Sequence, residues 1–138
     1  MTYAKQLAPD NVDDDAGNGN GFVDIFNTDG SFVKRFASNG TLNSPWAVVM
    51  APATFGSLGG EILVGNFGNG QISAFNATTG AFDDFMRDHE ANVLEIPGLW
   101  GLAFGTGAAA TTLYSASGPN DEQHGFLSTI TGPVPAGP

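Results

Sequence analysis

The residues best suited to chemistry lie in an acidic stretch near the start of the chain, DNVDDDAGNGNGFVD at 10–24. Hard cations such as Ca²⁺ are held by about six to eight oxygen ligands from closely spaced carboxylates and carbonyls in a flexible loop. The sequence therefore suggests Ca²⁺ as its one candidate cofactor, with three ligands: Asp13, Asp15 and Asp24. An EF-hand loop numbered from Asp13 would need glycine where Asn18 stands, and only its last position, Asp24, agrees. An exposed acidic loop between two strands is the alternative interpretation.

A second polar cluster, SGPNDEQHGF at 117–126, contains Asn120, Asp121 and His124. A histidine beside carboxylates can ligate a metal or act as a general base near neutral pH. In a metal-dependent hydrolase of the lactonase type, these three residues and Asn66 would face a divalent cation that acts as a Lewis acid. Asn and Asp also form ordinary turns, which is the alternative. We predict no catalytic residue, and Asp121 and His124 are the two candidates that would overturn this prediction.

The two tryptophans are candidates for ligand binding. Trp46 and Trp100 lie at the start of two similar apolar segments, WAVVMA and WGLAF. An indole at such a position can stack on a sugar or another ring, and Asn66 and Asn120 would add polar contacts to the ligand. A repeated tryptophan is also a common packing anchor between neighbouring units, because it buries a large area. The repetition favours packing over ligand binding.

These candidates belong to an internal repeat of about 50 residues. GNGFVDIFNTDG at 19–30 recurs as GNGQISAFNATTG at 68–80, and EILVGN at 61–66 recurs as TLYSAS at 112–117. The central unit predicts four strands, at 46–51, 62–66, 71–75 and 81–86. Glycine at the end of NTDG and ATTG supplies the positive φ that a hairpin turn needs. The innermost segments are almost continuously apolar, which predicts strands buried on both faces.

Four-stranded antiparallel units with this period are typical of a β-propeller. Twenty glycines and eight prolines also disfavour helices. The sequence therefore predicts an all-β partial β-propeller of about two and a half blades at 1–131. Its expected parts are an incomplete blade at 1–38, a full blade at 39–90, an incomplete blade at 91–131 and a Pro/Gly-rich tail at 132–138.

Charge and composition exclude several classes of function. Fourteen acidic residues against four basic ones give a formal charge of −10, which would repel nucleic acid and anionic membranes. The chain has no cysteine, so disulfides and thiolate chemistry are absent. No apolar run is long enough to span a membrane, and MTYAKQLAPD does not look like a signal peptide. No GxSxG elbow, P-loop or HExxH motif occurs.

Several segments resemble an uncharacterised bacterial β-propeller family that is distantly akin to NHL repeats. These segments are LNSPWAVVMAPATFG, EILVGNFGNGQISAFNATTGAF, GLWGLAFG and SGPNDEQHGFLSTIT. The resemblance implies six blades in the whole family protein, of which this chain would be the C-terminal half. It also implies export to the periplasm or the cell exterior, since some members carry an exosortase-type sorting tail.

A non-enzymatic role in binding or scaffolding is the function that these observations favour. Two alternatives remain, part of a lactonase-like metal-dependent hydrolase and a calcium-stabilised structural module. The expected partners are the remaining blades of a longer chain or a second copy, together with a small ligand or a protein. An incomplete propeller exposes sheet edges that favour such association.

Overall fold

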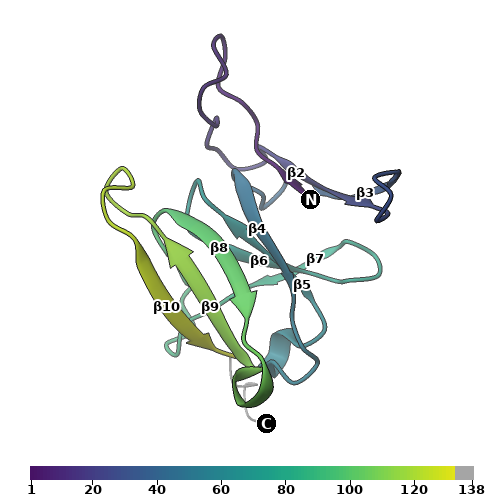
Figure 1. The fold of residues 1–138 in the computed structure, drawn as a ribbon, viewed down its shortest axis with the longest axis vertical. Coiled ribbons are helices and arrows are strands. Elements are labelled where there is room, and N and C mark those ends of the chain that lie inside the picture. Colours follow the sequence, from purple (N-terminus) through teal and green to yellow (C-terminus); the bar gives the residue numbers. More distant parts are fainter. Residues whose placement is uncertain (133–138) are drawn as a thin grey trace.

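The computed structural model describes residues 1–132, which form an all-β structure. Ten strands make three antiparallel sheets, and the described part of the chain contains no α-helix (Figure 1). Two short 3₁₀ turns, Gly56–Leu58 and Gly107–Ala109, each lie between the first and second strands of a sheet. The predicted tail lies, apart from its first residue, outside the described residues.

Each sheet is built from strands that follow one another along the chain. The N-terminal sheet has the order β1-β2-β3: β1 (Thr2–Tyr3), β2 (Phe22–Phe26) and β3 (Phe32–Ser38). The central sheet has the order β4-β5-β6-β7: β4 (Pro45–Met50), β5 (Ile62–Asn66), β6 (Ile72–Phe75) and β7 (Phe82–Phe85). The C-terminal sheet has the order β8-β9-β10: β8 (Leu99–Phe104), β9 (Thr112–Ser117) and β10 (Phe126–Thr131).

The predicted all-β class is confirmed, and the four strands of the central unit lie within two residues of their predicted bounds. Gly80, at the turn between β6 and β7, has φ +74°, a conformation that glycine adopts without strain. The three sheets do not close into a ring within the described residues.

The central sheet separates two hydrophobic cores, because neighbouring residues of a strand point to opposite faces. Leu63 and Ile72 pack in the core shared with the C-terminal sheet, with Leu99 and Leu113. The core on the other face, shared with the N-terminal sheet, consists of six buried residues: Val23, Phe36, Ala37, Leu42, Val64 and Phe75. The central sheet thus lies between the two outer sheets, and β5 has no solvent-exposed face.

One expectation about the innermost strands is wrong. β4 was predicted to be buried on both faces, yet its side chains alternate between buried Ala47 on one side and exposed Val48 and Met50 on the other. The buried side faces β8, which supplies Leu99 and Leu102 beside Gly65 and Ala47. Within the described residues, no equivalent innermost strand of the N-terminal sheet covers the other side. The apolar sequence of β4 is compatible with burial on both faces, but its second face becomes buried only if another strand covers it.

Candidate functional site

Trp46 lies on an exposed part of β4 and is held in place by an aromatic neighbour. The strand has a β-bulge between Pro45 and Ala47, which turns Trp46 out of the ladder. Its ring stacks on Phe67, with centroids 5.3 Å apart and an interplanar angle of 28°. Trp46 lies at the bulge of β4, and Phe67 directly follows β5 at the same end of the central sheet. The two stacked rings therefore form a small aromatic surface there.

Trp100 occupies the equivalent position in β8 but has a packing role. The same bulge recurs between Leu99 and Gly101. The indole Nε1–H of Trp100 donates a hydrogen bond to Glu122 Oε1 at 2.8 Å, and the ring lies close to Gly118. A Cβ at Gly118 would come within 2.2 Å of this ring, so the loop can approach only because it has glycine there. Trp100 thereby anchors the 118–125 loop to its own sheet.

Asn66, a predicted ligand contact, lies inside the protein. Its side chain is fully buried, and Oδ1 accepts a hydrogen bond from the backbone N–H of Asn43 at 2.9 Å. Its Nδ2 group donates to the backbone oxygen of Gln71 and to Ser73 Oγ, both at 3.1 Å. Both amide hydrogens are used within the protein, so Asn66 holds two loops together and presents no group to a ligand.

The remaining hydrolase candidates lie on a different, exposed loop. Asn120, Asp121 and Glu122 follow one another with φ values of +56°, +53° and +61°, which is the left-handed turn conformation that Asn and Asp tolerate best. His124 follows them and is exposed. The structure does not bring Asp121 and His124 together with Asn66, and no lactonase-like cluster forms among these residues.

The three calcium candidates are also separate. Asp24 is buried in β2 and forms an ion pair with Arg35, whose guanidinium lies 3.7 Å from the ring centroid of Phe22. Asp15 pairs with Lys5 in the loop between β1 and β2, while Asp13 accepts the backbone N–H of Asp14. Residues 1–132 hold no group of three acidic or histidine side chains placed to bind a metal ion. Calcium binding stays a prediction, and the geometry does not support it.

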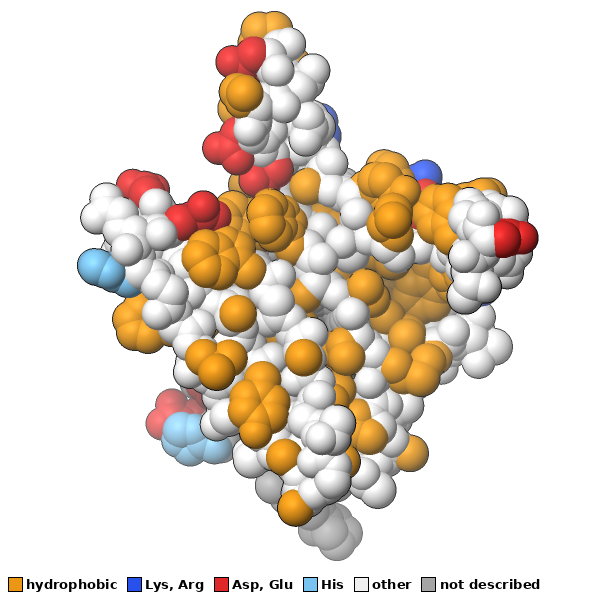
Figure 2. All heavy atoms as spheres, in the orientation of Figure 1, with side chains coloured by type: hydrophobic (Ala, Val, Ile, Leu, Met, Phe, Trp, Pro, Cys, Tyr) orange, Lys and Arg blue, Asp and Glu red, His pale blue; other side chains and the backbone are white. Residues whose placement is uncertain are grey.

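A groove of about 360 Å³, which was not predicted from the sequence, lies between the N-terminal and central sheets. Its walls are almost entirely apolar and include Ile25 and Phe36 on one side and Val48 and Met50 on the other. Hydrophobic side chains line both sides of this hollow in Figure 2, whereas acidic groups gather on the projecting loops. Among its lining side chains only Asp24 is charged, and it is paired with Arg35; the N-terminal ammonium of Met1 also lies at the groove. The strand count could have indicated this groove, because the N-terminal unit contains three strands where the central unit contains four.

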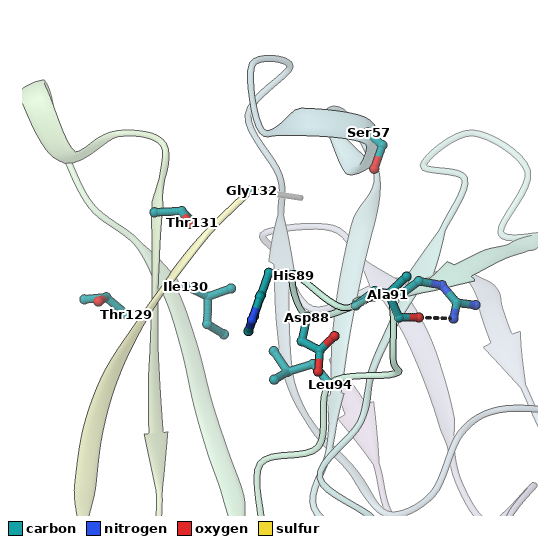
Figure 3. A pocket seen from close by; sticks show the side chains of 10 residues that line it. Ser57, Asp88, His89, Ala91, Leu94, Thr129, Ile130, Thr131 and Gly132 are labelled. Carbon is teal, nitrogen blue, oxygen red and sulfur yellow. Dashed lines mark hydrogen bonds between the residues drawn. The ribbon is translucent and has the colours of Figure 1, made fainter. Parts of the chain in front are cut away.

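A larger cleft of about 760 Å³ lies between β10 and the segment that connects β7 to β8 (Figure 3). Ile130 of β10 lies on one side of the cleft, and Asp88, His89 and Leu94 of the connecting segment lie on the facing side. Desolvation would raise the pKa of Asp88, but hydrogen bonds from Asn92 and Glu90 outweigh it and lower the pKa. Asp88 is therefore an ionised turn residue rather than a proton donor.

The chain is similar to three uncharacterised proteins of Acanthamoeba polyphaga mimivirus. The identities are 45% over 87 residues, 44% over 85 residues and 32% over 116 residues, which cover 63%, 62% and 84% of this chain. The matched part spans only 22% of the length of each of these relatives. No family model matches the chain. No solved structure matches it either.

These relatives correct the resemblance to a bacterial propeller family. The similar proteins are viral, so the attribution to a bacterial family is wrong. The expectation of export rested on that attribution and stays an untested prediction. In residues 1–132, no helix is long and apolar enough to cross a membrane.

Proposed function

We propose that the three sheets are successive blades of a β-propeller and that the chain has a binding or scaffolding role. Sheets of three, four and three strands in chain order support this arrangement, because they correspond to strands two to four, one to four, and one to three of a blade. The equal bulges at Trp46 and Trp100 support it as well. Both outer sheets pack on the central one, as neighbouring blades do.

The observation that carries the binding role is an apolar stripe on β4. Trp46, Val48 and Met50 remain 50%, 41% and 61% exposed and lead into the 360 Å³ groove. Burying a large apolar side chain contributes about 1.5–3 kcal/mol, so covering these half-exposed groups would contribute roughly 3 kcal/mol before the costs of association. A contiguous exposed apolar patch of this kind marks an interaction surface.

The partner at this stripe is an apolar polypeptide strand. On its opposite side β4 already packs against β8, with Ala47 facing Leu99 and Leu102 across Gly65. The two charged groups at the groove are both engaged within the protein: Asp24 forms an ion pair with Arg35, and the N-terminal ammonium of Met1 donates a hydrogen bond to the backbone oxygen of Asp24 at 2.8 Å. A strand with the composition of β8 would match both the shape and the polarity of this surface.

Isothermal titration with a peptide of residues 97–105, carrying two added lysines for solubility, tests the proposal. We expect binding to the whole protein and loss of at least about tenfold in affinity in Val48→Lys/Met50→Lys, which would introduce charge into the groove. Val33→Lys is the matched control, since Val33 is a similarly exposed apolar residue on β3. Equal binding by both variants, or no heat at millimolar peptide, would refute the proposal.

A further inference from the structure

The outer edge of β10 differs from the corresponding edge in the other two sheets. β10 pairs with β9 along its whole length, from Phe126 opposite Ser117 to Thr131 opposite Thr112. In the blade numbering proposed above, β10 is a third strand, and the third strands of the other two sheets, β2 and β6, are each followed by an outermost strand, β3 or β7. Within the described residues, no strand pairs with the second edge of β10.

The 760 Å³ cleft runs along this edge. Its lining includes Thr129, Ile130 and Thr131 in succession. Neighbouring side chains of a strand point to opposite faces, so a cavity that touches all three must lie beside the strand rather than over one face. The opposite wall is the 87–94 segment, as Figure 3 shows for His89 and Leu94. The cleft is therefore a slot between a strand edge and a fixed wall.

The sequence of β10 lacks the features that keep sheet edges unpaired. Natural edge strands carry charges, proline or bulges that prevent pairing with another chain. FLSTIT contains neither a charged residue nor proline, and its pairing with β9 is regular. Phe126 and Leu127 are 57% and 76% exposed. Such an edge is suited to receiving a further strand.

The strand register indicates which type of side chain an added strand would place opposite Ile130. Ile130 faces Leu113 of β9, just as Phe75 faces Ile62 of β5, which the repeat makes equivalent. Phe75 receives the ring of Phe82 from the outermost strand, edge-on with centroids 5.9 Å apart. Phe82 is also the residue that pairs with Phe75 in the ladder. An aromatic side chain opposite Ile130 would occupy the corresponding place in the cleft, which Leu94 also lines.

We propose that the cleft beside β10 binds an extended polypeptide strand, which pairs antiparallel with β10 and places an aromatic side chain against Ile130. The partner is a segment of the β7 type, in which two aromatic residues flank a polar pair, supplied from outside residues 1–132. The viral relatives have room for such a segment, since the matched region is 22% of their length. This site is separate from the β4 stripe, and either proposal can fail without the other.

Hydrogen exchange measured by mass spectrometry tests the site with the whole protein. The probe is a peptide of residues 80–87, GAFDDFMR, which contains β7 of this chain. We expect it to slow amide exchange at 126–131. The same peptide with Asp84→Pro should bind about tenfold more weakly, because it loses a backbone donor in the ladder.

Two protein variants complete the test. Ser57 of the first 3₁₀ turn is exposed and lines the cleft, so Ser57→Trp should fill the slot and abolish the protection while Ser57→Ala leaves it unchanged. Absence of protection at millimolar peptide, or protection that Ser57→Trp does not alter, would overturn the proposal. Protection that rises with protein concentration without peptide would overturn it too, because the occupant would then be a second copy of the chain.

Discussion

Replacing Asn66 by alanine distinguishes a residue that binds a ligand from one that supports the fold. Asn66→Ala would remove three hydrogen bonds, of which the one to the backbone N–H of Asn43 matters most. Asn43 is itself buried, and water has little access to its N–H group. An unsatisfied buried donor costs about 1–3 kcal/mol.

The other two partners lose less. The backbone oxygen of Gln71 keeps a hydrogen bond from the backbone N–H of Asn66 at 2.9 Å. Ser73 is fully buried and loses its donor, which costs about 1 kcal/mol. Together these terms predict that Asn66→Ala lowers the free energy of unfolding by about 3 kcal/mol.

Guanidinium chloride unfolding followed by circular dichroism measures this change as a lower midpoint with an unchanged slope. Ser73→Ala is the matched control, since it removes only one bond of the network, and about 1 kcal/mol is expected. A loss below 1 kcal/mol for Asn66→Ala, equal to that of the control, would refute the assignment of Asn66 to the fold. Its role in ligand binding would then have to be reconsidered.

Two further predictions concern a turn and a carboxylate. Gly80→Ala should lower the free energy of unfolding by more than about 3 kcal/mol, since a Cβ there would lie 2.2 Å from the backbone oxygen of Phe36. The control Gly30→Ala, at φ +87° with no atom within 4 Å of the added Cβ, should lower it by only about 1 kcal/mol. Thermal unfolding compares the two variants, and equal losses of stability would contradict the predicted clash. Desolvation, and then the charge of Asp83, raise the pKa of Glu61. At a pH above this raised pKa, Glu61 is ionised and its charge destabilises the folded protein. At a pH below the pKa of the unfolded chain, Glu61 is protonated in both states and this destabilisation is absent. Glu61→Gln should stabilise the protein at pH 7 by roughly 0.5 kcal/mol or less, with no difference below about pH 4; a pH-independent difference would contradict the cause.

Local pattern explains which parts of the fold could be predicted. The bounds of β5 agree with the prediction because ILVG is apolar and ends at a polar turn, and Gly80 has the positive φ expected of a hairpin glycine. Trp46 and Trp100 are equivalent because both occupy the same bulge, which follows from their place in the repeat. Short-range sequence determines these features.

The rest depended on neighbours that the sequence does not specify. An apolar strand such as β4 looks the same whether or not another strand covers it, so the exposure of Met50 could not be predicted. Asn66 lies beside a glycine-rich turn and was a candidate ligand contact, but its side chain is buried and accepts a hydrogen bond from Asn43 of a distant loop. The clefts escaped prediction because they arise between sheets.

The alternation of Leu63 and Val64 along β5 has a consequence for how the molecule unfolds. One peptide unit joins two residues that belong to different cores, so a displacement of β5 loosens both cores at once. Within residues 1–132, each outer sheet shares its buried core with the central sheet and not with the other outer sheet. The cooperativity of the whole molecule therefore depends on the central sheet, and the two ends, although remote from each other, are thermodynamically coupled through it.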